Sequence, residues 1–174
     1  SVTDPRGVRH ESTYNEVDWL VETKAAASAA TDGSGAPALN LKTTFLHDEN
    51  GNVVEERIPF GDDGSTFTRV ERDHGVLNEV KQTRREIGAG DFAVTTLTYD
   101  ESFNVATILE PEGQLSRLTH NSRNLLEAMD RGVDSPEAVQ ESYAYDAEGQ
   151  RTTFTDGRTH SIVTSYDGFG RVAK

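Results

Sequence analysis

The 174-residue chain carries 30 acidic side chains against 17 basic ones, and its formal net charge of −13 would repel phosphate backbones and anionic lipid head groups. Binding to nucleic acid and insertion into membranes are therefore not expected, and no apolar stretch approaches the ~18 residues that span a bilayer. The absence of cysteine excludes disulfides, thiolate metal sites and thiol nucleophiles, and a hydrophobic content of 34% predicts a thin core.

The N-terminal part predicts a turn, a strand and a second turn. Asp4-Pro5-Arg6-Gly7 has the chemistry of a tight turn, with Pro pre-setting φ at the second position. Seven residues later, Tyr14-Asn15 opens a short unit that recurs along the chain. The Ala/Ser/Gly-rich segment 24–37 is predicted to be a loop insertion, with a turn of helix across Ala25 to Ala30.

Two further copies of the unit follow in the middle of the chain. One begins at His47-Asp48 and reaches its glycine at Gly51. The other is assigned to Glu71 to Leu77, with its glycine at Gly75, although Glu71-Arg72 has lost both Tyr and Asp. The turn at 61–64 ends seven residues before Glu71, which is the spacing seen between Gly7 and Tyr14.

The last third of the sequence shows the repeat best. In Tyr-Asp-x-x-Gly, Asp at the first turn position bonds its own backbone and Gly at the fourth accepts positive φ, so the chain must reverse there. A second kind of turn, Glu110-Pro111-Glu112-Gly113, stands between the Tyr units. Four-residue turns are predicted at 100–103, 110–113, 121–124, 146–149 and 156–159, and strands at 104–109, 114–120, 150–155 and 160–166. Segment 132–138 is predicted to be a second insertion, in which Ser135-Pro136-Glu137 opens one helical turn.

This alternation predicts an all-β fold, an antiparallel meander of tandem β-hairpins that forms a twisted, curved sheet. Residues 1–174 are predicted to be a single array of about seven units, part of a longer array. The units begin at Tyr14, His47, Glu71, Tyr99, His120, Tyr145 and Tyr166. The structural positions of the repeat are Tyr14, Asn15, His47, Asp48, Gly51, Gly75, Tyr99, Asp100, His120, Asn121, Tyr145, Asp146, Gly149, Tyr166, Asp167 and Gly170.

Tyr-Asp-x-x-Gly-x-(Leu/Val), followed about eleven residues later by (Asp/Glu)-Pro-x-Gly, resembles the YD-repeat or RHS-repeat family over nearly the whole chain. That family includes bacterial polymorphic toxins, the C component of insecticidal Tc toxins, wall-associated bacterial proteins and the animal teneurins. The resemblance implies a β-sheet strip that spirals into a hollow shell, which encloses a C-terminal effector in the toxins and serves extracellular adhesion in teneurins. Some toxin relatives carry a self-cleaving Asp-Pro-x-Gly segment, but Asp4 to Gly7 lacks the Leu/Tyr-rich stretch that follows it.

No catalytic, cofactor-binding or metal-binding residue is predicted. Asp48 to Asn52 has the oxygen density of a calcium loop, yet it lacks the later bidentate acid and sits in register as a repeat turn. The histidines form no zinc-binding pair, and no serine has the surroundings of a hydrolase nucleophile. The chain is therefore not expected to be an enzyme, and no cofactor is expected.

The aromatic side chains leave two functional interpretations open. Tyr99, Tyr145 and Tyr166 are expected to line one face of a stacked array, where they pack across strands. If that face is exposed, Trp19, Tyr99 and Tyr145 are candidates for stacking on sugars, as in an extracellular adhesin or carbohydrate-binding module. The leading interpretation is a non-catalytic segment of an RHS/YD-repeat shell that encloses a cargo or toxin polypeptide, with an apolar concave face and a charged outer face.

The shell interpretation predicts the partners and the location of the protein. The partner is the remainder of its own parent chain, meaning further repeats and an enclosed effector. The terminal strands are open sheet edges, so edge-to-edge self-association is also expected. The protein is expected to be secreted or to lie on the surface of a bacterium.

Overall fold

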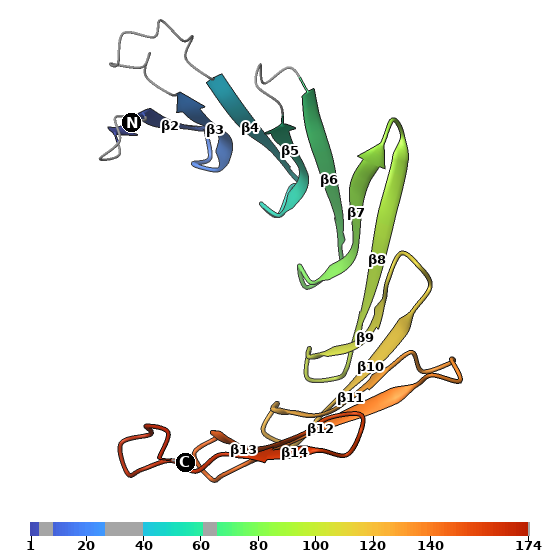
Figure 1. Cartoon of the computed structure of the whole chain (residues 1–174). Helices are drawn as coiled ribbons and strands as arrows, with labels where there is room; N and C mark the ends of the chain where they lie inside the picture. The colour runs from blue at the N-terminus through green and yellow to red at the C-terminus, as the bar shows by residue number, and fades with distance from the viewer. Residues whose placement is uncertain (4–8, 27–39, 61–65, 174) are drawn as a thin grey trace, which may run out of the picture. The chain divides into compact units, whose positions relative to one another are not determined.

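A computed structural model describes residues 1–3, 9–26, 40–60 and 66–173 of the chain. They form one sheet of 14 strands whose spatial order follows the chain from β1 to β14 (Figure 1). The described residues are strands, turns and bends, without a helix. The predicted all-β antiparallel meander of hairpins is confirmed. The described part contains no helix long and apolar enough to cross a membrane.

The chain divides into two compact units, Ser1–Val94 and Thr95–Lys174, and the boundary falls inside β8 (Asp91–Tyr99). The other strands of the first unit are β1 (Val2–Thr3), β2 (Arg9–Tyr14), β3 (Leu20–Ala26), β4 (Asn40–His47), β5 (Val53–Phe60), β6 (Thr66–His74) and β7 (Val80–Gly88). Those of the second unit are β9 (Val105–Leu109), β10 (Leu115–His120), β11 (Leu126–Arg131), β12 (Val139–Tyr145), β13 (Arg151–Thr155) and β14 (Ser161–Val163). That residues 1–174 behave as one array stays a prediction.

Every second hairpin ends in the same irregularity. At the end of β2, β4, β6, β8, β10 and β12 the register shifts, because the returning strand carries one extra residue, a β-bulge. The last residue of the outgoing strand then pairs with the residue six positions later: Tyr14 with Leu20, His47 with Val53, His74 with Val80, Tyr99 with Val105, His120 with Leu126 and Tyr145 with Arg151. The bulge thus marks the repeat independently of which residues occupy it.

In the first unit the two faces of the sheet differ in chemistry. Directly paired residues share a face, so the pairings place Ala25, Leu41, Phe45, Ile58, Phe60 and Val70 on one face, the apolar face of unit 1. The opposite face carries ion pairs within and between strands, among them Lys42 with Glu22 (2.6 Å) and Arg84 with Glu71 (3.0 Å). Strand alternation therefore places most of the apolar side chains on one face and most of the ion pairs on the other. The ion pair of Arg72 with Glu56 (3.0 Å) is an exception, because Glu56 pairs with Phe45 and Val70 on the apolar face.

The second unit also has one mainly apolar face, but the chemistry of its polar face differs from that in the first unit. One face carries Leu97, Ile108, Leu118, Met129, Tyr143, Phe154 and Ile162, together with the polar side chains of Ser116, Arg131 and Glu141. The other face is rich in hydroxyl groups, which bond across strands: Thr98 to Thr107 (2.7 Å) and Thr155 to Ser161 (2.9 Å). On this polar face, hydrogen bonds that include the one from Gln140 to the carboxylate of Asp130 (2.7 Å) take the place of the ion pairs of the first unit. The ion pair of Arg131 with Glu141 (3.5 Å) lies on the apolar face.

Neither unit has a closed core in its described part. Val70, 8% exposed, is the one buried hydrophobic side chain among the described residues, and no described side chain is fully buried. Ile162 and Val163 of β14 are 64% and 71% exposed. A globular domain packs a second layer of secondary structure on such an apolar face. The described residues form a single layer.

Three predicted local features differ from the structure. Glu71 lies inside β6, and the turn after β6 begins at Gly75, so His74 rather than Glu71 holds the Tyr position. Segment 132–138 forms two successive β-turns, from Ser135 N to Gly132 O and from Ala138 N to Ser135 O, and not a helical turn. Strand 160–166 shortens to β14, after which Tyr166 forms an isolated bridge with Val172.

The first predicted insertion is described only at its margins. Lys24 to Ala26 belong to β3, so the expected helical turn does not begin at Ala25. Residues 27–39, and the predicted turns at 4–7 and 61–64, lie outside the residues that the structure describes, apart from their flanks.

Candidate functional site

The hairpin turns that follow the Tyr position share one backbone geometry. We number the five residues after the Tyr position 1 to 5, so that position 1 is Asp100 and position 5 is Asn104 in the turn after β8. The amide of position 4 donates to the carbonyl of position 1 (Phe103 to Asp100, 3.1 Å), and the amide of position 1 donates to the carbonyl of position 5 (2.9 Å). Position 4 is left-handed in every such turn, with φ from 60° to 86°: Asp18, Gly51, Asn78, Phe103, Asn124, Gly149 and Gly170.

The side chain at position 1 stabilises this reversal. In the turn after β4, Oδ1 of Asp48 accepts hydrogen bonds from the amides of Asn50 and Asn52, both at 2.9 Å. These amides, at positions 3 and 5, point into the turn and have no strand partner there. Asn15, Asp100, Asn121 and Asp167 accept the same two bonds in their turns. In each of these turns the side chain at position 1 thus accepts backbone hydrogen bonds within the reversal.

The residue at position 5 matches the residue at position 1. Where position 1 is Asp, its second oxygen accepts from a donor at position 5: Asn52 (2.9 Å), Asn104 (3.0 Å), Gln150 (3.3 Å) and Arg171 (2.8 Å). Where position 1 is Asn, that second atom is itself a donor, and position 5 is Trp19 or Leu125. The sequence shows this matching, but it becomes meaningful only once positions 1 and 5 are known to face each other.

These hydrogen bonds lower the pKa of the turn carboxyls. For Asp48 and Asp100 the largest cause is the side-chain bond from Asn52 or Asn104, and for Asp167 it is the bond from Arg171. Backbone amides contribute further, and the positive charge of a neighbouring histidine lowers the pKa of Asp48 and Asp100 as well. The lowered pKa favours the ionised form of each carboxyl, in which its oxygens accept the hydrogen bonds of the turn.

The turn after β6 has no acid at position 1, but a carboxylate still accepts a hydrogen bond from the amide at position 3. Gly75 occupies position 1, and Glu79 at position 5 folds back so that its Oε2 accepts from the amide of Leu77 at 3.0 Å. A Cβ atom on Gly75 would lie 1.9 Å from Oε1 of Glu79, so the glycine makes room for this carboxylate. Backbone hydrogen bonds lower the pKa of Glu79, as in the Asp turns.

At two of the Tyr positions, the side-chain hydroxyl forms a hydrogen bond with the preceding hairpin. The hydroxyl of Tyr145 donates to the carbonyl of Leu126 (2.8 Å), and that of Tyr166 donates to the carbonyl of Arg151 (3.0 Å). In both cases the acceptor is the first residue after the preceding turn. At His120 the ring lies instead beside the preceding turn's Asp100, with Nδ1 3.9 Å from Oδ2. Tyr14, in the first turn, is 57% exposed.

The candidate sugar-stacking residues are half-buried and engaged within the fold. The indole of Trp19 lies over Gly51, and its ring centroid is 5.4 Å from that of His47. The hydroxyl of Tyr145 is used as described above, and Tyr99 also has a partner. The aromatic pair on a sheet face is a different one, Tyr143 and Phe154, with ring centroids 5.4 Å apart. Sequence reasoning missed this pair because neither residue belongs to the repeat motif.

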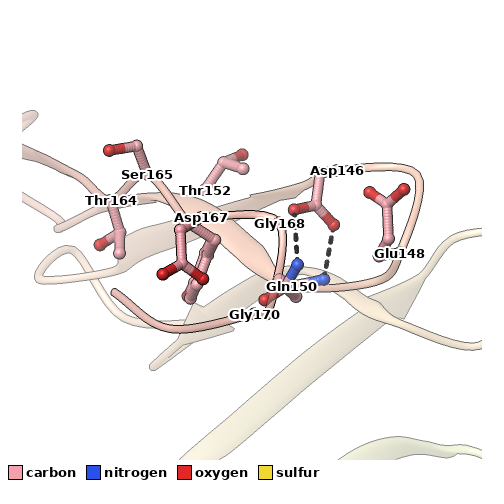
Figure 2. A pocket seen from close by; sticks show the side chains of 10 residues that line it. Asp146, Glu148, Gln150, Thr152, Thr164, Ser165, Asp167, Gly168 and Gly170 are labelled. Atoms are coloured by element: carbon pink, nitrogen blue, oxygen red, sulfur yellow. Dashed lines mark hydrogen bonds between the residues drawn. The ribbon is translucent and has the colours of Figure 1, made fainter. Parts of the chain in front are cut away.

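A hollow in the second unit lies between its last two repeat turns, and Figure 2 shows the side chains that line it. Three carboxylates, Asp146, Glu148 and Asp167, border it, but two of them hold their own turns together: Asp146 binds the amide and side chain of Gln150, and Asp167 binds Arg171. Among the described residues no cluster of three His, Asp or Glu side chains could hold a metal ion.

Comparisons with known proteins agree with this architecture at the level of the fold. No family model matches the chain, and no curated protein matches it. The chain is similar to one chain of the TcdB2-TccC3-Cdc42 crystal structure, at 16% identity and a TM-score of 0.65, over 96% of this chain and 9% of that one. It is similar to TcdB2-TccC3 without its hypervariable C-terminal region at 16% identity and a TM-score of 0.67, over 98% and 9%.

A third match is to a structure of the Photorhabdus luminescens Tc holotoxin pore with a TccC3 mutation, at 12% identity over 94% of this chain and 12% of that one. Its TM-score of 0.27 carries no argument about the fold. The chain spans only 9% of the length of the two better-matching chains. At 16% identity, the likeness shows that this chain shares their β-sheet fold.

Proposed function

We propose that this chain is a non-catalytic structural segment of an RHS/YD-repeat shell that encloses a cargo or toxin polypeptide. The observation that carries the proposal is the single-layered sheet with two chemically distinct faces. A layer with one apolar and one polar face suits a wall, because one side can be covered by contents while the other faces solvent.

The second unit illustrates the argument. Leu118, Met129, Tyr143 and Phe154 share a face with Ile162, which is 64% exposed, and the described residues offer no second layer to cover them. An uncovered apolar surface of this kind marks an interaction site. We infer that the rest of the parent chain, as further repeats and an enclosed effector, covers it.

The comparisons support this proposal. The repeat resembles a family that includes the C component of Tc toxins, and the fold is similar to chains from TcdB2-TccC3 structures. On this basis we propose that the protein is secreted or located at a bacterial cell surface, and that it acts without catalysis, cofactor or nucleic acid.

The alternative is an adhesin or carbohydrate-binding module with an exposed aromatic face. The engaged positions of Trp19 and Tyr145 favour the shell. A glycan array, followed by titration of the fluorescence of Trp19, the only tryptophan, distinguishes the two. The shell proposal expects no saturable signal, whereas saturable sugar binding that quenches this tryptophan would support the module.

These 174 residues contain no cysteine, so thiols that are introduced into them and located by peptide mapping can report which face is covered. Ile162 and Val163 are neighbours in β14 with similar exposure, but Ile162 lies on the apolar face with Phe154, and Val163 lies on the opposite face with Thr153. We expect Ile162→Cys in the complete natural protein to resist a bulky maleimide, while Val163→Cys reacts readily.

The isolated 174-residue chain is the matched control for this experiment. There both thiols are expected to react at rates within about threefold of each other, because nothing covers either face and their fractional exposures are similar. Equal labelling of the two positions in the complete protein would show that the apolar face encloses nothing, and would refute the shell.

A further inference from the structure

Neighbouring repeat turns touch through a fixed pair of positions. The side chain at position 5 of one turn contacts the left-handed residue at position 4 of the next turn in the same unit. Between the turns after β4 and β6, Asn52 Nδ2 donates to Asn78 Oδ1 at 2.8 Å. Between the turns after β8 and β10, Asn104 Nδ2 donates to Asn124 Oδ1 at 3.1 Å. The same position pair thus carries the same bond in both units.

We call the contact between two neighbouring repeat turns of one unit a junction. The other junctions use the same two positions, but there a side chain at position 5 lies against a glycine at position 4. Trp19 lies against Gly51, Leu125 against Gly149 and Gln150 against Gly170. A Cβ atom on the glycine would lie 3.1 Å from indole carbons of Trp19, 3.8 Å from Cδ1 of Leu125 or 3.2 Å from Oε1 of Gln150. Trp19 and Gln150 therefore come close enough to crowd a Cβ atom at position 4, whereas Leu125 lies at an ordinary contact distance from one.

The left-handed backbone conformation limits which residue types suit position 4. Asn and Gly are the residues that adopt positive φ at least cost, so either satisfies the turn by itself. The turn does not explain which of the two is present. The residue present varies with the neighbour: Asn occurs where position 5 of the preceding turn is Asn, and Gly occurs where position 5 is Trp, Leu or Gln.

We propose that positions 5 and 4 form a pairing code between successive repeat turns, which selects the hairpin that packs beside each hairpin and fixes its spacing along the sheet. In this code, Asn pairs with Asn through an amide hydrogen bond, and a larger side chain pairs with Gly through close packing. These are positioning residues of the wall. The code concerns hairpin against hairpin, so it does not depend on whether the wall encloses a cargo.

Two junctions in the second unit allow a conservative exchange, because both have Asp at position 1 and an amide side chain at position 5. Asn104→Gln with Asn124→Gly converts the first junction into the type found at Gln150 and Gly170. Gln150→Asn with Gly170→Asn makes the reverse conversion. Each double variant keeps a matched pair, whereas each of the four single variants creates a mismatch.

The full chain and these variants are compared by thermal unfolding and by amide hydrogen exchange. We expect each single variant to lower the unfolding midpoint by about 2–4 °C, the shift that corresponds to one lost contact in a protein of this size. Each double variant should return to within about 1 °C of the parent, which is a non-additive result. The backbone amide of residue 124 donates to Asn121 O at 2.9 Å in the parent chain. Its exchange, corrected for the intrinsic rate of Asn or Gly, should rise in the single variants at positions 104 and 124 and recover in the double variant.

Additive effects, in which each double variant is as unstable as its two single variants summed, would overturn the code. Purely local contributions of each residue to its own turn predict that additivity, so the double-variant result separates pairing from general stabilisation. All substituted residues lie in turns at the ends of strands. Asn and Gly both suit the left-handed position, so the variants are expected to fold. The labelling of Ile162→Cys tests the shell separately.

Discussion

The turn after β6 and the turn after β8 have the same backbone hydrogen bonds but opposite placements of their carboxylate. In the turn after β8, Asp100 at position 1 reaches forward to the amides of Ser102 and Asn104. In the turn after β6, Glu79 at position 5 reaches back to the amide of Leu77, over a glycine at position 1. In both turns a carboxylate oxygen accepts from the amide at position 3. The comparison indicates that this amide needs an acceptor, which a side chain at either position 1 or position 5 can supply.

This comparison predicts that loss of the acceptor is costly in both turns. Asp100→Ala removes the acceptor of two backbone amides and of the Asn104 side chain, and we expect the unfolding midpoint to fall by about 4–6 °C. Glu79→Ala removes one such bond, so a smaller fall of about 2–3 °C is expected. Differential scanning calorimetry measures both.

Glu101→Ala is the matched control for these variants, because Glu101 is an exposed acid in the same turn as Asp100 and accepts none of these turn bonds. Its effect should stay within about 1 °C. An Asp100→Ala variant as stable as this control would mean that the backbone alone closes the turn.

A smaller effect is expected when one turn type is converted into the other. Gly75→Ala places a Cβ atom where Glu79 lies, so we expect a loss similar to that of Glu79→Ala. Gly75→Asp with Glu79→Asn installs the arrangement of Asp48 and Asn52, and should restore the unfolding midpoint to within about 1 °C of the parent. If the double variant is less stable than Gly75→Ala, the two turns are not equivalent and the comparison fails.

The same comparison explains how much the sequence could predict. Asp100 to Phe103, Glu110 to Gly113 and Asp146 to Gly149 were recognisable as turns, because Asp, Pro and Gly act through local chemistry, and all three reverse the chain as predicted. From them the antiparallel meander follows. The turn at Gly75 was misplaced by three residues, because its acceptor comes from position 5, where the motif gives no signal.

Other features depend on partners distant in sequence. The hairpin between β7 and β8, around Gly90, carries neither motif and was not predicted. The fit of Trp19 against Gly51 joins residues 32 positions apart (51 − 19), so the sequence left open whether Trp19 packs within the fold or is a candidate for stacking on sugars. Comparison of the repeats identifies equivalent positions in the sequence. Contacts between neighbouring repeat turns can be assigned only when the spatial arrangement of the turns is known.

The smallest predicted effect concerns acid, and it contrasts an Asp turn with an Asn turn. The bond from Arg171 and the amides of Phe169 and Arg171 lower the pKa of Asp167 below its ordinary value of 3.8 in the folded chain. A carboxyl with a lowered pKa stabilises the fold above its unfolded pKa, and this contribution is lost as the pH falls through the folded pKa. The turn at Asn121 has no titrating group at position 1, so its contribution should not change with pH in this range.

Carbon-detected NMR titration of the side-chain carboxyls measures this directly. Asp167 should titrate with a midpoint below 3.8, and Arg171→Met should move that midpoint upward, because the largest cause of the lowered pKa is removed. In unfolding experiments, the advantage of the parent chain over Asp167→Asn should be constant above about pH 5 and shrink below it. An advantage that persists unchanged to pH 2 would show that Asp167 supports its turn as well when protonated as when ionised, and that the contrast between Asp and Asn turns is one of shape and not of charge.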